Sequence, residues 1–167
     1  LHITNELVIR LATEHDVDAV QALLQDCIAD MRQVGIDQWD EIYPGYGTLL
    51  TDIRTETLYL GFKHGATLAG ALTLDEFQAS EWSMTQWRIS GGRIMVVHRV
   101  MVSPPHQGQG IGTNLMQFAE TWGRAKGYDA IRLDAFSGNP RSLRFYRRLG
   151  YHDAGGVRFR KGILRCF

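Results

Sequence analysis

Residues 100–112 read VMVSPPHQGQGIG, and this stretch contains the transition that decides the fold. A run rich in β-branched residues ends at two prolines, and glycines follow at positions 108, 110 and 112 before a helical pattern begins. Glycine leaves backbone N–H groups unobstructed at the start of a helix, beside the positive end of its dipole. That arrangement favours phosphate binding. The stretch predicts a phosphate-binding loop over residues 107–113, with a glycine turn needed only for close packing as the alternative.

The length and composition indicate one domain. The chain has 167 residues, of which 44% are hydrophobic and 22% charged, as in ordinary globular proteins. No apolar run approaches the length of a membrane span, and residues 1–11 mix polar and apolar side chains unlike a signal peptide. Cys27 and Cys166 form neither a CxxC motif nor a metal-ligand spacing. We therefore expect a reduced, cytoplasmic chain without a metal site or a membrane partner.

The formal net charge of zero conceals an asymmetry. Residues 1–58 hold eleven acidic and three basic residues, whereas residues 141–167 hold eight basic residues and one acid, Asp153. Basic termini often bind nucleic acid, but these arginines alternate with Leu143, Tyr146 and Leu149 in a core-forming pattern, and the pI is near 7.2. We expect no nucleic-acid partner.

Periodicity predicts alternating strands and helices. Thr13 and Asp16 are typical of a helix start, Gly35 of its end, and Asn139 followed by Pro140 of a last helix that ends near Gly150. A strand, helix and strand around the glycine loop form a βαβ unit in a mixed sheet. The predicted strands are 7–11, 58–62, 67–74, 94–102, 130–134 and a final pair before residue 167; the other predicted helices are 17–35, 48–55 and 112–126, and residues 75–92 are a long connection.

Two other phosphate loops are disfavoured by spacing. A nucleoside triphosphate loop needs a lysine after its last glycine, and none follows here. A dinucleotide-binding unit needs a third glycine, which residues 113–115 lack, and an acid after the next strand, for which Asp134 is tolerably placed. Only about thirty residues follow Asp134, too few for the rest of a doubly wound sheet.

The pattern Q-x-x-G-x-G at Gln107, Gly110 and Gly112 resembles the (Arg or Gln)-x-x-G-x-(Gly or Ala) motif of the GCN5-related N-acetyltransferases, the GNAT superfamily. The stretches HRVMVSP at 98–104 and NPRSLRFYRRLGY at 139–151 are also similar to that superfamily's acetyl-CoA half. The resemblance implies an α/β fold (α+β mixed sheet). It has a mixed, mostly antiparallel central sheet with a splayed parallel strand pair and about four helices. Residues 1–92 are then the acceptor-side half and residues 93–167 the acetyl-CoA-binding half.

The resemblance also implies which residues bind acetyl-CoA as co-substrate. The backbone of the strand entering the loop pairs with pantetheine, and the N–H near Met101 faces the oxyanion, although a plain core strand is the alternative. Asn139 is expected to contact pantetheine, but it also has a sufficient role as helix cap. The expected cofactor-binding residues are Val100, Met101, Val102, Gln107, Gly108, Gln109, Gly110, Ile111, Gly112, Thr113, Asn139, Ser142, Tyr146 and Arg148.

Two residues are expected to move protons. Tyr146 matches the tyrosine that family members often place beside the coenzyme sulfur as general acid, with an ordinary core residue as the alternative. His98 lies on the central strand and is the candidate general base, with a satisfied core histidine as the alternative. Strand alternation places Arg99 on the opposite face, paired with a carboxylate.

The acceptor is expected to be a primary amine of a small molecule or peptide, attacked directly in a ternary complex. Asp37, Asp40 and Glu41 would attract a cationic amine, and Trp39 and Tyr43 would supply an apolar wall. Exposed aromatic residues in 75–92 would form either a lid or the edge of a homodimer. The alternative function is a non-catalytic acyl-CoA-binding or sensing module.

Overall fold

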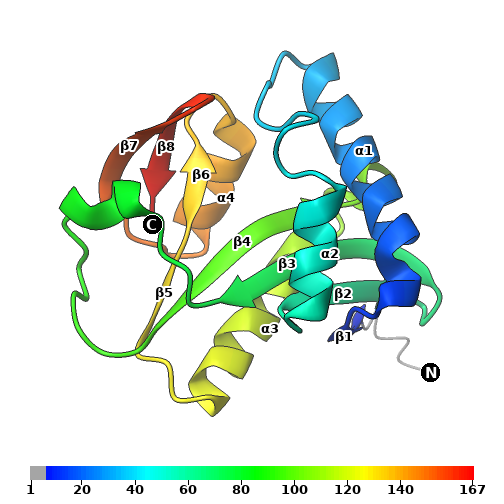
Figure 1. The fold of residues 1–167 in the computed structure, drawn as a ribbon, viewed down its shortest axis with the longest axis horizontal. Coiled ribbons are helices and arrows are strands. Elements are labelled where there is room, and N and C mark those ends of the chain that lie inside the picture. Colours follow the sequence, from blue (N-terminus) through cyan, green and yellow to red (C-terminus); the bar gives the residue numbers. More distant parts are fainter. Residues whose placement is uncertain (1–6) are drawn as a thin grey trace.

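The computed structural model describes residues 7–167, and its core is a mixed five-stranded sheet (Figure 1). The strand order is β1-β2-β3-β4-β5, and every neighbouring pair is antiparallel except β4 and β5, which are parallel. A smaller antiparallel sheet has the order β6-β8-β7. The expected mixed, mostly antiparallel sheet with a parallel pair is confirmed. The strands are β1 (Leu7–Leu11), β2 (Leu58–Lys63), β3 (Thr67–Asp75), β4 (Ile94–Val102), β5 (Ala130–Arg132), β6 (Asp134–Phe136), β7 (Gly155–Phe159) and β8 (Gly162–Cys166).

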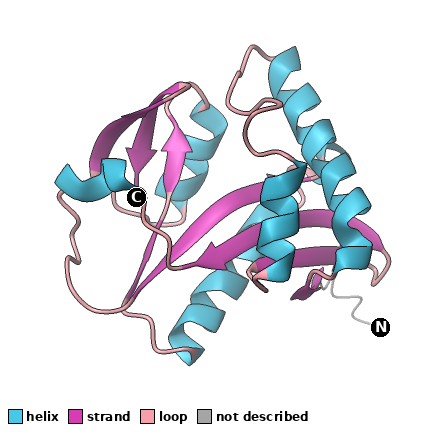
Figure 2. Ribbon diagram, viewed as in Figure 1, coloured by secondary structure: helices cyan, strands magenta, loops and turns pink. Residues whose placement is uncertain are grey.

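Helices cover both faces of the large sheet (Figure 2). One face packs against α1 (Val17–Gln33) and α2 (Tyr46–Arg54), where Leu24 and Met101 are almost fully buried. The other face packs against α3 (Ile111–Ala125), where Leu115 is fully buried, and Tyr146 of α4 (Pro140–Arg148) joins this second core. Two layers of apolar side chains therefore hold β4, the central strand, in place.

Local signals place the helix ends close to their predicted positions. Before α1, the carboxylate of Asp16 accepts a hydrogen bond from the Thr13 N–H at 2.7 Å. At α4, the Asn139 side chain accepts one from the Ser142 N–H at 3.3 Å, so the predicted cap is confirmed. The helix predicted over 48–55 begins two residues earlier, after Gly45, because an extended glycine satisfies the N-cap.

The prediction of one strand over 130–134 is wrong. Arg132 is the last residue to pair with β4, and after Leu133 the chain changes sheets, so that Asp134 pairs with Cys166 of β8. The backbone of Leu133 bonds instead to Phe167 at the end of the chain. Because β4 continues in the large sheet while β6 turns away into the small sheet, a wedge opens between the two strands, which is the splayed pair (Figure 1).

The prediction that His98 and Arg99 face opposite sides of β4 is also wrong. Thr73 pairs with His98 and Ala71 with Met101, so β4 has one extra residue and bulges at Arg99. The φ of Arg99 is +49°, in the left-handed region. A bulge interrupts the alternation of side chains. Both side chains therefore line one cavity, described below.

The connection between β3 and β4 is long, as predicted, but its aromatic residues are not all exposed. Trp82, in a 3₁₀ turn at Ser80–Met84, is 4% exposed and lies edge-on against Trp87. Phe77 is 67% exposed. Trp82 is buried because it packs with Val96 and Cys166 in the core beneath the small sheet.

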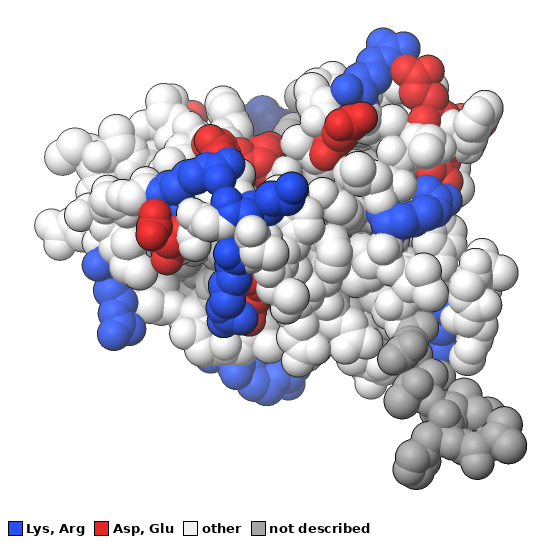
Figure 3. Space-filling view, turned by 90° about the horizontal axis from the view of Figure 1, so that it is seen from below, with Lys and Arg blue, Asp and Glu red and all other residues white. Residues whose placement is uncertain are grey.

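The surface mixes charges. On the face seen from below, acidic side chains lie next to basic ones rather than in separate single-sign areas (Figure 3). Among the helices within residues 7–167, none has the length and apolar character that crossing a membrane requires.

Candidate active site

The glycine loop leaves a row of backbone donors free. Gly108 and Gly110 have φ values of +74° and +81°, which glycine adopts without strain, and Gly110 directly precedes α3. Within residues 7–167, the backbone N–H groups of residues 108–113 donate no hydrogen bond. A Cβ on Gly112 would lie 3.2 Å from the ring of Phe145, so α3 and α4 approach closely here. Free donors at a helix start match the predicted phosphate loop.

Beside this loop lies a cavity of about 470 Å³, which we call the loop cavity. Every residue predicted to bind the coenzyme lines it except Gln109. The Gln109 side chain is exposed and instead accepts a hydrogen bond from Lys63 Nζ at 2.6 Å. The loop cavity is lined by Cys27, Asp30, Met31, Ile36, Gln38, Trp39, Val100, Met101, Val102, Gln107, Gly108, Gly110, Ile111, Gly112, Thr113, Asn139, Arg141, Ser142, Phe145, Tyr146 and Arg148.

A larger cavity of about 740 Å³ fills the wedge between β4 and β6, and we call it the wedge cavity. The two predicted acceptor residues and the predicted base line it. The wedge cavity is lined by Gln38, Trp39, Tyr43, Asp52, Asp75, Phe77, Ala79, Ser80, Glu81, Trp82, Val97, His98, Arg99, Val100, Asp134, Ala135, Phe136, Ser142, Tyr146, Phe159, Arg160, Lys161 and Leu164.

The two cavities share a wall, and Tyr146 belongs to it. Tyr146 is 8% exposed, and its ring lies edge-on against the rings of Phe145 and Tyr151. Burial raises the pKa of the Tyr146 hydroxyl well above its usual range, and the nearby Asp134 carboxylate raises it further. Tyr146 therefore keeps its proton at neutral pH at the point where the cavities meet.

His98 is held by a carboxylate. Its Nε2 lies 2.9 Å from Oδ1 of Asp75, and the two side chains are 17% and 23% exposed. The same Asp75 oxygen accepts a hydrogen bond from the Phe77 N–H, which fixes its position. A carboxylate partner orients an imidazole ring and fixes which nitrogen carries the proton. The geometry suits a proton acceptor on the wall of the wedge cavity.

Comparison with known proteins agrees with this geometry. The model of the acetyltransferase (GNAT) family matches residues 21–151. The chain belongs to the GNAT family. It is 32% identical over 147 residues, 86% of this chain and 81% of the relative, to YesJ of Bacillus subtilis (strain 168), described as an uncharacterized N-acetyltransferase. The predicted enzyme class, an N-acetyltransferase, is confirmed.

Solved structures show the same fold. A GNAT acetyltransferase from Streptococcus agalactiae 2603 has a TM-score of 0.81 at 23% identity, covering 96% of this chain and 92% of its own. The PaiA N-acetyltransferase from Thermoplasma acidophilum, solved in complex with coenzyme A, has a TM-score of 0.73 at 16% identity, covering 96% and 98%. The two cavities thus occur on a GNAT scaffold.

In this GNAT chain, Asn139 is fully engaged by the protein. Besides capping α4, it donates from Nδ2 to Oε1 of Gln38 at 2.9 Å, and it is 6% exposed. Gln38 follows α1, so this contact ties the segment after α1 to the start of α4. Arg148 is exposed on the rim of the loop cavity, whereas Arg141 pairs with Asp30 at 3.3 Å.

The expectation that Asp37, Asp40 and Glu41 line the acceptor cleft is wrong, because none of them lines the wedge cavity. Asp40 accepts hydrogen bonds from Arg160 at 2.8 and 3.0 Å, which hold its carboxyl pKa far below its usual range. Lys161 bridges Asp37 and Asp40. Glu41, the third acid of this loop, pairs with Arg32 of α1 at 3.3 Å, so all three carboxylates already have a basic partner.

Four acidic residues line the wedge cavity and were not predicted as site residues: Asp52, Asp75, Glu81 and Asp134. Asp52 forms a buried ion pair with Arg99, which also donates to the Tyr43 hydroxyl. From the sequence, Asp134 is a candidate only as the acid that a dinucleotide-binding site would need. A usable signal was its place at the carboxyl end of a strand parallel to its neighbour, where ligands bind in α/β sheets.

The cysteines and the acidic groups do not form a metal centre within residues 7–167, where no cluster of three His, Cys, Asp or Glu side chains has that geometry. Cys27 and Cys166 are both buried. Burial raises the pKa of the Cys27 thiol to about 12 and that of Cys166 to about 11. Both are therefore protonated and unreactive at neutral pH.

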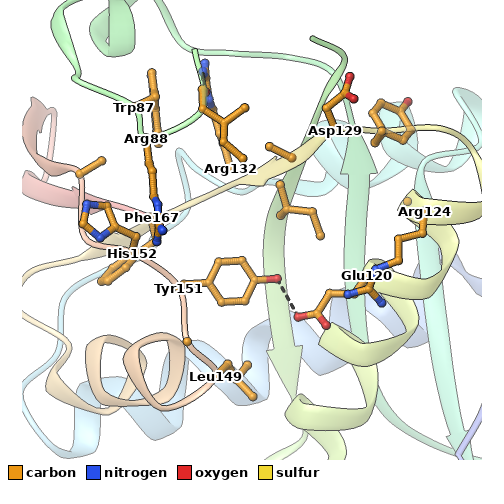
Figure 4. Close-up of a pocket in the computed structure, with 17 residues that line it drawn as sticks. Trp87, Arg88, Glu120, Arg124, Asp129, Arg132, Leu149, Tyr151, His152 and Phe167 are labelled. Atoms are coloured by element: carbon orange, nitrogen blue, oxygen red, sulfur yellow. Dashed lines mark hydrogen bonds between the residues drawn. The ribbon is translucent and has the colours of Figure 1, made fainter. Parts of the chain in front are cut away.

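A third cavity of about 380 Å³ lies between the C-terminal half of α3 and the segment that follows α4 (Figure 4). Across it, the Tyr151 hydroxyl donates to a Glu120 carboxylate oxygen at 3.1 Å. None of the residues predicted for the site lines this cavity. We therefore place the candidate active site at the other two cavities, which meet at Tyr146.

Proposed function

We propose that this GNAT protein transfers the acetyl group of acetyl-CoA to a primary amine of a small molecule or peptide by direct attack in a ternary complex. The observation that carries the proposal is the meeting of two cavities at Tyr146. One cavity has the glycine loop at its edge, and the other is lined by apolar side chains and by acidic and basic ones. Two substrates entering from the two sides would meet at one proton-bearing side chain.

The loop cavity fits coenzyme A. Free N–H groups over residues 108–113 would hold the pyrophosphate, and the exposed Arg148 would face a further phosphate. On the β6 side, β4 has no strand partner beyond Val96, which leaves its backbone free to pair with pantetheine. In this assignment residues 93–167 supply most of the coenzyme site, and the acceptor side, expected from residues 1–92, is built from both halves.

Acetyl-CoA supplies a thioester whose sulfur departs as a thiolate. The Tyr146 hydroxyl would donate the proton that the thiolate requires, because its raised pKa keeps it neutral until then. A backbone N–H of β4 near Met101 would face the carbonyl oxygen. His98, oriented by Asp75, would take the proton that the amine must lose before or during attack.

The test is Tyr146→Phe, with Tyr128→Phe as a matched control outside both cavities, where the hydroxyl donates to Glu76. Tyr146→Phe should lower kcat by about 10²- to 10⁴-fold with little change in the dissociation constant of acetyl-CoA. Tyr128→Phe should leave kcat unchanged. Equal kcat values for both variants would reject the role of Tyr146. Coenzyme binding without turnover of any amine would instead identify an acyl-CoA-binding module.

A further inference from the structure

The wedge cavity contains one carboxylate, that of Asp134, that has neither a basic side chain in hydrogen-bond contact within the described part of the chain nor full exposure to water. Of the acids lining it, Asp52 is held by Arg99 through two hydrogen bonds of 2.8 Å, and Asp75 by His98. Glu81 is exposed, so water solvates it. The Asp134 carboxylate is stabilised in neither of these ways, because it is only partly exposed and forms no ion pair within residues 7–167. It is the partly buried acid of this cavity that has no basic side chain in hydrogen-bond contact among the described residues.

The contacts of Asp134 leave one of its carboxylate oxygens available to the cavity. Its Oδ2 accepts a hydrogen bond from Trp82 Nε1 at 3.1 Å, and within residues 7–167 its Oδ1 has no partner. The charged or titratable groups near it are His98 on β4, Tyr146 on α4, Cys166 on β8 and Glu81 in the connection after β3. Burial raises the pKa of the Asp134 carboxyl, which shows that its ionised form is poorly stabilised here.

A cationic ligand would stabilise the ionised Asp134 carboxylate. A buried carboxylate gains most from a partner that brings both a charge and hydrogen-bond donors, as a primary ammonium group does. The cations of the lining, Arg99, Arg160 and Lys161, are already paired with Asp52, Asp40 and Asp37. The lining also has apolar side chains, among them Phe136 on the same strand, Trp82 and Trp39. Such walls suit the uncharged body of an amine.

We propose that Asp134 binds the ammonium group of the acceptor and thereby selects cationic primary amines. This inference rests on the proposed function, because it places the acceptor nitrogen between Asp134, His98 and Tyr146, next to the wall shared with the loop cavity. Asp134 would then be the source of selectivity for cationic amines, instead of the acidic loop after α1, whose charges are already paired. Asp134 acts here as a specificity-determining residue.

The experiment compares amines with alcohols of the same shape. The probes are phenethylamine, butylamine and glycinamide, each paired with 2-phenylethanol, 1-butanol and glycolamide, titrated calorimetrically into the protein saturated with coenzyme A. Wild-type protein should bind at least one amine more tightly than its alcohol. Asp134→Asn, which keeps an oxygen for Trp82, should weaken that amine by about 10- to 100-fold and leave its alcohol unchanged.

Asp26→Asn is the matched control, since it makes the same change at an exposed acid that lines neither cavity. It should leave amine affinity unchanged. The inference is overturned if wild-type protein does not distinguish any amine from its alcohol, or if Asp134→Asn weakens both members of a pair equally. Both outcomes leave acetyl transfer standing as long as coenzyme A binds. Failure of wild-type protein to bind coenzyme A would overturn the proposed function instead.

Discussion

The ion pair between Arg99 and Asp52 lends itself to a quantitative test. Arg99 donates to both carboxylate oxygens at 2.8 Å, and each side chain is 9% exposed. Arg99→Met keeps the length of the side chain but leaves Asp52 charged, buried and supported only by the hydroxyl of Thr73. Breaking a buried pair by removing one partner costs about 3–5 kcal/mol of unfolding free energy.

The control is Arg54→Met, which removes an exposed ion pair with Glu14 whose side chains are both 61% exposed. Exposed pairs contribute about 0–1 kcal/mol. With about 2–4 °C of melting temperature per kcal/mol for a chain of this size, Arg99→Met should melt about 6–20 °C lower and Arg54→Met less than about 4 °C lower.

Urea unfolding of both variants and of Arg99→Met combined with Asp52→Leu measures the free energies directly. The double variant should recover part of the loss, because it removes the unpaired charge along with its partner. The reasoning is refuted if Arg99→Met costs no more than Arg54→Met, or if the double variant is less stable than Arg99→Met by the full cost of a second independent change.

Three further outcomes are expected. Iodoacetamide should not label Cys27 or Cys166 in folded protein at neutral pH, since burial raises both thiol pKa values; labelling at the unfolded-state rate, followed by mass spectrometry, would contradict this. Because the folded-state pKa of Asp134 is raised, its ionisation costs stability as pH rises above the ordinary value of 3.8. The stability advantage of Asp134→Asn over wild type should therefore grow from about pH 3 to neutrality in urea titrations, and a constant difference would refute it. Dialysis against EDTA should leave turnover unchanged, and a loss restored by a divalent metal would show a metal requirement.

The parts of the site that sequence predicts are those built from neighbouring residues. The glycine loop, the cap at Asn139 and the spacing from there to Tyr146 each lie within one turn and its helix, where local geometry leaves few alternatives. The family resemblance added the arrangement of the strands. Together they placed Tyr146 beside the loop cavity without knowledge of the tertiary structure.

The features that sequence did not predict depend on distant partners. Arg99 bulges out of the alternation of β4 where it reaches Asp52, 47 residues away, and Asp40 is neutralised by Arg160, 120 residues away. Asp134 becomes a cavity wall only because its strand leaves β4 to pair with β8. Charge patterns along a sequence show which groups are present, but the pairing decides which of them keep a free charge.

The most direct test of coenzyme binding at the loop cavity is calorimetric titration with acetyl-CoA of wild type, Gly110→Glu and Gly127→Glu. Both glycines have positive φ, +81° and +76°, and open space around a new side chain, so the two variants carry a similar backbone strain. Only Gly110 lines the loop cavity. We predict saturable binding by wild type and Gly127→Glu and none by Gly110→Glu. Absence of binding to folded wild type, or equal binding by all three proteins, would contradict the account.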